Sequence, residues 1–389
     1  MESKLSCCKK YRYLNHKQVP SEFQELFIYT GYRNPNSSFR SCFKSIFCLN
    51  NNESINFWTH FIPFLICLGI LVKNLCTNEV IKDYLTYPLL VQLSTICFYL
   101  LMSSLAHMLN CMSPIARHVC FILDYLSISI YGMGCAIAYK SYTLSTIKSS
   151  QKDKLFDYYI LMVLIVSLIA NVMSSTSRFI ISPLQRSILR TLSFVIQYVF
   201  VNLPLLYRYI YFYHQTIFKN FNFIFSFLSS SSDIEIVHHD NYFLFKKGSD
   251  FFYLIQFLAA LSSAFLYTTH VPERFWPGKF DIIGQSHQIF HITSFICSLS
   301  QYTALKYDMK QLIEMAHDQI FDRASFGYST VPIIDSKISN SKIMAICLFL
   351  NFLILVYYYF KAIYFNPWNK SKIVNRKIDK GKNGHHKDD

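Results

Sequence analysis

The sequence predicts an all-α polytopic membrane protein. Of its 389 residues, 52% are hydrophobic and only 15% are charged, whereas soluble proteins carry about 25% charged residues. The apolar residues gather in eight runs of roughly 20, the length that an α-helix needs to cross a bilayer. The net charge of +14 lies mostly in the tails and loops between these runs, a pattern typical of membrane proteins. We therefore expect a membrane and no nucleic acid as a partner.

The first half of the chain contains four predicted spans. The preceding residues, 1–54, are polar and carry eight Lys or Arg against four Glu, so we expect a basic cytosolic segment there. Each run that follows is apolar over a length suited to one membrane helix. The runs are Ile55–Leu75, Tyr87–His107, Val119–Tyr139 and Tyr158–Ser174.

The second half of the chain contains four more. Pro204 lies inside the first of them and predicts a bend, because proline interrupts the helical hydrogen bonds. We expect residues 306–342 to form a loop before the last span, and the basic residues 365–389 to form a disordered tail. The runs are Ser187–Phe212, Phe251–Thr269, Gly284–Leu305 and Ile343–Tyr364.

Eight spans place both ends of the chain on one side of the membrane. Both terminal segments are basic. Since positively charged loops and tails stay on the cytoplasmic side, we expect both termini to be cytoplasmic.

Polar side chains from distant parts of the sequence are predicted to meet at one depth of the bilayer. Successive spans alternate in direction, so the starts of spans one, three and seven lie on the same side as the end of span two. Ionisable groups within a membrane are costly and are functional candidates. The side chains at these four positions are Glu53, Asn56, His60, Ser103, His107, Asp124, His287 and His291.

Three of these histidines form a candidate metal site. His287 and His291 are four residues apart and therefore share one helix face, and His107 ends the second span at the same depth. Three imidazoles with one open position are the arrangement of a catalytic zinc site, in which Asp124 and Ser103 would act on a zinc-bound water. In the alternative, each histidine pairs with a carbonyl group or with Asp124 at a helix interface.

Glu53, Asn56 and His60 at the start of the first span allow two interpretations. They are candidates for groups that orient the metal ligands. Helix capping by Asn52 or Glu53 explains the same polar cluster equally well.

Gln197 and Asn202 in the fifth span are too polar to face lipid, so we expect them to face the interior of the bundle. They are candidates for binding a polar atom of a ligand, although hydrogen bonding between helices also accounts for them.

Several stretches resemble the progestin and adipoQ receptor family. VPERFWPGKFDIIGQSHQIFH (271–291) is similar to its most specific signature, and NNESINFWTH, SSLAH and Asp124-Tyr125 resemble its first three helices. FIYTGYRNPNSS, MSPIARHVCFILDY, AIAYKSYT and the eighth span are similar to the membrane progestin receptor branch.

The resemblance implies a seven-helix transmembrane bundle, residues 55–305, followed here by an eighth C-terminal transmembrane helix at 343–364. It implies a zinc ion (Zn²⁺) held by His107, His287 and His291, with Asp124 and Ser103 holding the zinc-bound water. In SISIYGMGC, Tyr131 and Cys135 depart from the family pattern, which leaves the shape of the pocket and its ligand open.

Three functions are consistent with these features. The first is a plasma-membrane receptor for a steroid (progestin-like) or other lipidic ligand that signals to a cytosolic protein. The second is an intramembrane zinc amidase that acts on ceramide-like lipids, since a zinc-bound water is a nucleophile for amide carbonyls. In the third, zinc is structural and the protein is a scaffold or pore.

Overall fold

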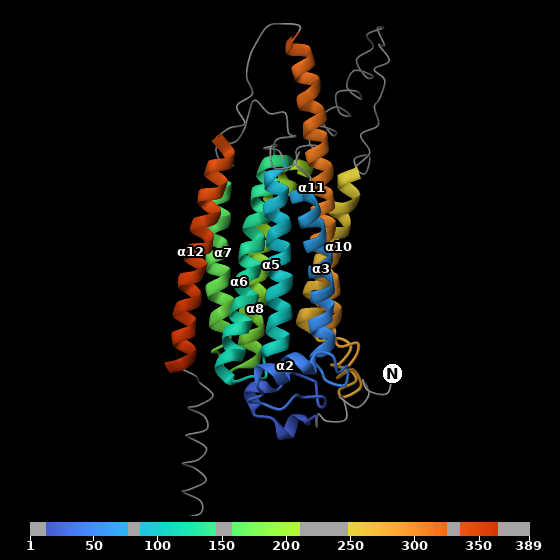
Figure 1. Ribbon diagram of the computed structural model, residues 1–389, viewed down its shortest axis with the longest axis vertical. Helices are drawn as coiled ribbons and strands as arrows, with labels where there is room; N and C mark the ends of the chain where they lie inside the picture. The colour runs from blue at the N-terminus through green and yellow to red at the C-terminus, as the bar shows by residue number, and fades with distance from the viewer. Residues whose placement is uncertain (1–12, 77–85, 145–157, 211–247, 325–334, 365–389) are drawn as a thin grey trace, which may run out of the picture.

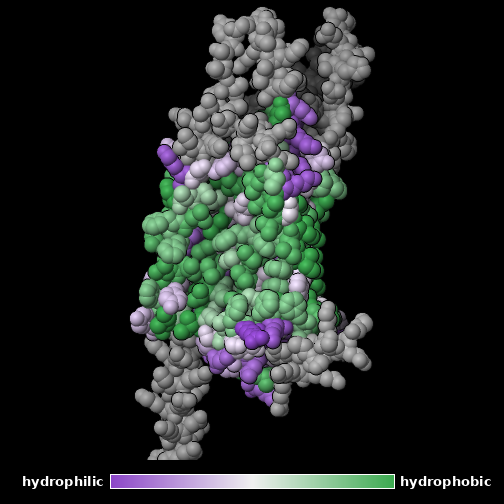
Figure 2. All heavy atoms as spheres, viewed as in Figure 1, coloured by the Kyte–Doolittle hydropathy of each residue, from purple (hydrophilic) through white to green (hydrophobic). Residues whose placement is uncertain are grey.

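The computed structural model describes residues 13–76, 86–144, 158–210, 248–324 and 335–364. These ranges are all-helical apart from turns and one isolated antiparallel bridge between Leu14 and Tyr32. The long helices stand side by side as a bundle (Figure 1), and an apolar band covers the middle of the face seen in Figure 2. The predicted all-α membrane architecture is therefore confirmed.

The helices follow the predicted spans closely. Three short elements precede the bundle: η1 (His16–Gln18), η2 (Ser21–Phe23) and α2 (Phe39–Ser45). The long elements are α3 (Ser54–Cys76), α5 (Tyr87–Leu109), α6 (Pro114–Ala138) with its π-helical extension η3 (Tyr139–Thr143), α7 (Tyr159–Ser177), α8 (Pro183–Val201), α10 (Gly248–Thr269), α11 (Ser286–Ala324) and α12 (Asp335–Tyr364).

Six helices in the described part of the chain are long and apolar enough to cross a membrane. A seventh span results if α8 and the helix Leu203–Ile210, which meet at an angle of 50°, are counted together. Pro204 lies in the first turn of this second helix, so the predicted bend is confirmed. The bend arises because proline has no backbone N–H to donate to the preceding turn of the helix.

α11 is too polar to be counted as a span by length and hydropathy alone. It nevertheless packs against α10, α3 and α5 and runs along the height of the bundle (Figure 1). Its polar side chains, such as Ser298, Gln301 and Asp308, are buried inside the protein. Inward-facing polar groups thus lower the mean hydropathy of this helix. Because α11 is not counted as a span by this criterion, the total of eight spans stays a prediction.

The predicted loop 306–342 is largely helical. α11 continues to Ala324, and α12 begins at Asp335. α12 then packs against α6 and α7. Its end at Tyr364 lies at the same end of the bundle as α2 (Figure 1), as an even number of spans requires.

Two glycines in α6 allow close helix packing. A Cβ atom at Gly134 would overlap the Thr95 side chain of α5, and one at Gly132 would overlap Gln197 of α8. α6 therefore lies directly against both neighbours, and its residues Met133, Cys135, Ala136 and Ile137 are buried in the main hydrophobic core.

The segment before α3 forms a small cap over one end of the bundle. Val19, Phe23, Ile28 and Tyr32 pack together in an apolar cluster of their own. Asp281, in the loop before α11, accepts hydrogen bonds from the backbone N–H groups of residues 29 and 30 at 3.1 and 2.7 Å. The cap is thereby tied to the start of α11, where two of the candidate ligands lie.

Candidate metal centre

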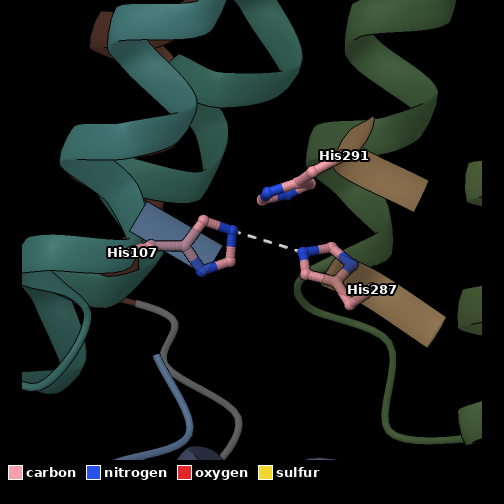
Figure 3. A group of neighbouring side chains, drawn as sticks. All are labelled: His107, His287 and His291. Atoms are coloured by element: carbon pink, nitrogen blue, oxygen red, sulfur yellow. Dashed lines mark hydrogen bonds between the residues drawn. The ribbon is translucent and has the colours of Figure 1, made fainter. Parts of the chain in front are cut away.

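The three predicted metal ligands come together at the capped end of the bundle. His107 lies in the last turn of α5, and His287 and His291 lie in the first two turns of α11. Their candidate ligand atoms all lie within 4.8 Å of one another. Figure 3 shows the three imidazoles facing a common point, with His107 on one side and the α11 pair on the other.

The spacing of the nitrogens fits a metal ion. The Nε2 atoms of His107 and His287 are 3.2 Å apart. Two nitrogens of a tetrahedral zinc site, each about 2.0–2.1 Å from the ion, lie about 3.3–3.4 Å apart. The cluster of three histidines contains no carboxylate or thiol among the described residues, which leaves the fourth position of such a site to a non-protein ligand.

Glu53 fixes the orientation of His107. Its Oε2 lies 2.7 Å from His107 Nδ1, and a carboxylate can only accept a hydrogen bond. Nδ1 therefore carries the ring proton, and the lone pair of Nε2 faces the other two histidines. Asn110 and Asn56 donate to the same carboxylate at 2.6 and 3.1 Å, so both of its oxygens are held.

The charge of Glu53 is stabilised where it stands, just before α3. Burial by itself raises the pKa of this carboxyl. The hydrogen bond with His107 and the nearby Arg33 and Arg117 outweigh that effect and lower the pKa below its ordinary value. Glu53 is therefore an anion next to a metal ligand, an arrangement that raises the basicity of the imidazole.

His291 is oriented by α3 in the same way. Its Nδ1 lies 3.1 Å from the carbonyl oxygen of Asn56 and 2.9 Å from Thr59 Oγ1. Because a carbonyl only accepts, Nδ1 is again the protonated nitrogen and Nε2 keeps its lone pair. His60 stacks on the His291 ring with centroids 3.8 Å apart and contacts the His291 carbonyl oxygen through Nε2 at 3.3 Å.

The start of α3 is capped by a residue other than those predicted. Asn51 Oδ1 accepts hydrogen bonds from the backbone N–H groups of Glu53 and Ser54, both at 3.0 Å. The Glu53 carboxylate instead contacts His107. Capping by the side chain of Asn52 or Glu53 is thus not the explanation for this polar cluster.

Asp124 and Ser103 lie beside the histidines without joining them. Ser103 is buried one turn before His107, and Asp124 is half-buried in α6. The Asp124 carboxyl faces the Ser103 hydroxyl and lies near His107 and Arg190. Asp124 is not one of the three clustered ligands.

Gln197 and Asn202 contact neighbouring helices. Gln197 Nε2 donates to the Ile128 carbonyl oxygen of α6 at 3.0 Å. Asn202 Oδ1 accepts hydrogen bonds from Tyr139 at 2.9 Å and from Gln256 of α10 at 2.9 Å. Their hydrogen-bonding role in the described structure is therefore between helices, and a role in ligand binding stays a prediction.

Two supporting contacts were not predicted from the sequence. Arg33 of the cap donates to the carbonyl oxygen of His107 at 2.5 Å and to that of Met108 at 2.9 Å, which caps the end of α5. Glu273 accepts hydrogen bonds from the backbone N–H of Ser286, at 2.7 Å, and from its hydroxyl, at the start of α11. A carboxylate there is favoured by the helix dipole. Arg33 and Glu273 both lie in stretches that resemble the family's motifs. That resemblance was the sequence signal that could have identified them.

Comparison with known proteins agrees with this arrangement. Residues 48–302 match the haemolysin-III related family. Human membrane progestin receptor gamma is 32% identical over 293 residues, 75% of this chain and 79% of the receptor. Zebrafish (Danio rerio) membrane progestin receptor gamma-B is 33% identical over 322 residues, 78% and 84% of the two chains.

Human membrane progestin receptor delta is 34% identical over 294 residues, 75% of this chain and 77% of the receptor. The family match begins just before Glu53 and ends after His291, so it spans every residue of the histidine cluster and its partners on α3 and α5. The chain is therefore a multi-pass membrane protein that belongs to the haemolysin-III related family, as its resemblance to the progestin and adipoQ receptors predicted.

Proposed function

We propose that this protein is a membrane receptor for a steroid, progestin-like, or for another lipidic ligand, and that it carries a zinc ion at His107, His287 and His291. The observation that supports the receptor function most is the similarity to membrane progestin receptors over three-quarters of the chain. We further propose that the receptor acts at the plasma membrane with both termini in the cytoplasm, where a signalling protein would bind.

We further propose the division of the chain that the apolar runs and basic segments indicate. Residues 1–54 are a basic segment and 55–305 the zinc-containing core. Residues 306–342 are a connection and 343–364 the eighth helix, which is followed by a basic tail at 365–389.

The interior of the bundle contains a buried polar atom with no hydrogen-bond partner among the described residues. Gln92 of α5 is fully buried, and its Oε1 has no hydrogen-bond partner among the described residues. Tyr131 and Cys135 both donate to Gln301 Oε1 nearby, the latter at 3.0 Å. Pockets for apolar ligands carry a few polar groups that orient the ligand, and an unpartnered acceptor in this position suits a steroid hydroxyl.

Saturable binding of a radiolabelled steroid to membranes containing the full chain tests the receptor function. Gln92→Leu should weaken binding about tenfold, since a buried hydrogen bond and its desolvated partner are lost. Gln185→Leu makes the same chemical change at an exposed position and should have no effect. Absence of saturable binding, or equal effects of both variants, would contradict the proposal.

Zinc is supported by the chemistry of the donors. The imidazoles of His107 and His291 present lone pairs fixed by Glu53 and by Asn56 and Thr59, which is how histidine ligands of zinc are held. When bound, zinc would act as a Lewis acid at the position left to a non-protein ligand.

A second function, hydrolysis of a lipid amide such as ceramide, is supported by Asp124 and Ser103. Both lie next to the histidines without being ligands, so the carboxylate is available to accept a proton. Asp124→Asn should keep the zinc and abolish hydrolysis by detergent-purified protein. Hydrolysis at the wild-type rate in this variant would exclude the assigned role of Asp124. That result would not count against the receptor function, which steroid binding tests separately.

A further inference from the structure

We propose that four arginines beside the metal centre form a binding pocket for a phosphate-bearing ligand. A cavity of about 60 Å³ lies where the starts of α6 and α8 meet the end of α7 and the cap. One water needs roughly 10–15 Å³ on the same measure, so this cavity has room for several waters or one phosphate group. The arginines that line it are Arg117, Arg178, Arg186 and Arg190.

Buried nitrogen atoms in this pocket lack partners. Arg117 is 5% exposed and the neighbouring His118 is 3% exposed. Within the described ranges, no hydrogen-bond partner is found for the Nε atoms of Arg117 and Arg178, for one terminal nitrogen of Arg190, or for Nδ1 of His118. Leaving buried donors unsatisfied is costly, especially on charged groups. Their arrangement indicates an acceptor supplied by a ligand.

The charges in the pocket favour an anion. Four arginines face two acidic side chains, Glu22 and Glu25. Arg117 pairs with Glu25. Arg178 lies over the Phe121 ring at 4.7 Å, and Arg190 over the Tyr125 ring at 5.1 Å. Aromatic rings thus hold these two cations in place without neutralising them.

Helix geometry adds to this positive potential. Arg117 lies in the first turn of α6, which begins at Pro114, and Arg186 lies in the first turn of α8, which begins at Pro183. Two long helices therefore direct the positive ends of their dipoles toward the pocket.

The number of converging donors distinguishes phosphate from carboxylate. A carboxylate is satisfied by one guanidinium, which binds it through two parallel hydrogen bonds. Several guanidinium groups from three different elements suit a tetrahedral group with more oxygens and more charge. The shared chemistry is therefore a phosphate, carried either by a lipid headgroup or by a soluble molecule.

The pocket is separated from the metal centre by one aromatic ring. The Phe121 centroid lies 5.8 Å from that of His107 and 5.2 Å from the Arg117 guanidinium carbon. Because the pocket lies at the ends of three predicted spans, it is at the depth of lipid headgroups. This assignment does not depend on the proposed receptor function or on bound zinc.

The test uses the full chain in nanodiscs of phosphatidylcholine. In one arm, inorganic phosphate is titrated and binding is measured by calorimetry and by the shift of the unfolding temperature. In the other, phosphatidylinositol 4-phosphate is included in the nanodisc. Saturable stabilisation in either arm is the expected result, and the arm with the tighter response identifies the source of the phosphate.

Matched charge-removing substitutions make the test specific. Arg178→Gln combined with Arg186→Gln should weaken binding about tenfold or more, since a charged hydrogen bond is lost. Arg40→Gln makes the same change at an exposed residue of α2 and should leave binding unchanged. If the double variant fails to fold, Glu25→Gln serves instead. It removes the competing carboxylate and should tighten phosphate binding several-fold.

Three results would overturn the proposal. They are no saturable response in either arm, an equal effect of Arg40→Gln, or binding of acetate as strong as that of phosphate. Zinc content, measured on the same samples, should be unchanged in all variants, which separates this pocket from the metal centre.

Discussion

Two polar clusters lie buried toward opposite ends of the bundle, with α11 contributing to both, and they are built differently. At the end away from the cap, Arg208 donates to Asp308 at 2.8 Å and to Asp250 at 2.5 Å. Tyr253 donates to Asp308 at 2.8 Å. We call Arg208, Asp250, Tyr253 and Asp308 the paired-charge cluster. At the capped end, by contrast, the three histidines face one another with no acidic ligand among them.

The difference indicates which cluster is suited to bind a ligand that the protein chain itself does not supply. In the paired-charge cluster each charge meets an opposite charge, and one Asp308 oxygen alone lacks a hydrogen bond among the described residues. In the histidine cluster, His107 and His291 keep lone pairs on Nε2, and among the described residues His287 is the one that contacts Nε2 of His107. The first arrangement is typical of a structural role, and the second of a binding site.

Arg208→Met should give the largest effect, on stability. Removal of one member of a buried ion pair leaves an uncompensated charge, which costs about 3–5 kcal/mol. We expect a strongly lowered unfolding temperature of the detergent-purified protein. The zinc content of the chains that stay folded should not change, because Asp308 lies about six helical turns from His287 along α11.

Lys306→Met is the matched control, since Lys306 is an exposed cation one turn or less from Asp308. It should leave the unfolding temperature close to that of the wild type. Equal stability of the two variants would mean that the paired charges are not structural.

His287→Ala should have the opposite signature, loss of metal with retention of the fold. Mass spectrometry of the wild type is expected to show about one zinc per chain, and the variant none. A bound ion present at 100 times its dissociation constant stabilises a protein by about 2.7 kcal/mol. Removing zinc with a chelator should therefore lower the wild-type stability to that of the variant.

His16→Ala, in the cap, controls for loss of a histidine elsewhere. If His287→Ala and the chelated wild type both lose the folded protein, zinc has a structural role and the contrast between the two clusters disappears.

The membrane helices were predictable because each span is a local signal. The apolar run Ile55–Leu75 became α3, Ser54–Cys76, since about 20 apolar residues suffice to specify a span without knowledge of their neighbours. The meeting of His107 with His287 followed from the alternating direction of the spans. Neither inference needed a side-chain contact.

The supporting contacts were less predictable because they depend on the rotation of each helix. Nothing in the spacing indicates that Thr59, one residue before His60, is the one that reaches His291 Nδ1. Arg33 and Glu273 act from loops whose paths are set by the packing of the cap. Gln301 and Asp308 lower the hydropathy of α11. Their hydrogen-bond partners lie on other helices, so the sequence of α11 alone does not show that these side chains are satisfied inside the bundle.

Glu53→Gln sharpens the comparison at the metal centre itself. The amide keeps the size of the side chain but removes the charge that supports His107. Loss of a partner behind a histidine ligand weakens metal binding roughly 10–100-fold, and we expect this range in competition with a fluorescent zinc chelator. Glu314→Gln, at an exposed position of α11, is the control. Zinc binding as tight as that of the wild type would show that Glu53 only packs against His107.

Thr59→Val should have the smallest effect and separates charge from geometry. The two side chains have similar shapes, so the change removes one neutral hydrogen bond to His291 Nδ1 while the Asn56 carbonyl still accepts from it. A neutral hydrogen bond contributes about 0.5–1.5 kcal/mol, or roughly two- to tenfold in zinc affinity. The same chelator competition measures it. An effect as large as that of Glu53→Gln would mean that orientation of the rings, and not the negative charge, controls how tightly this end of the bundle binds its ion.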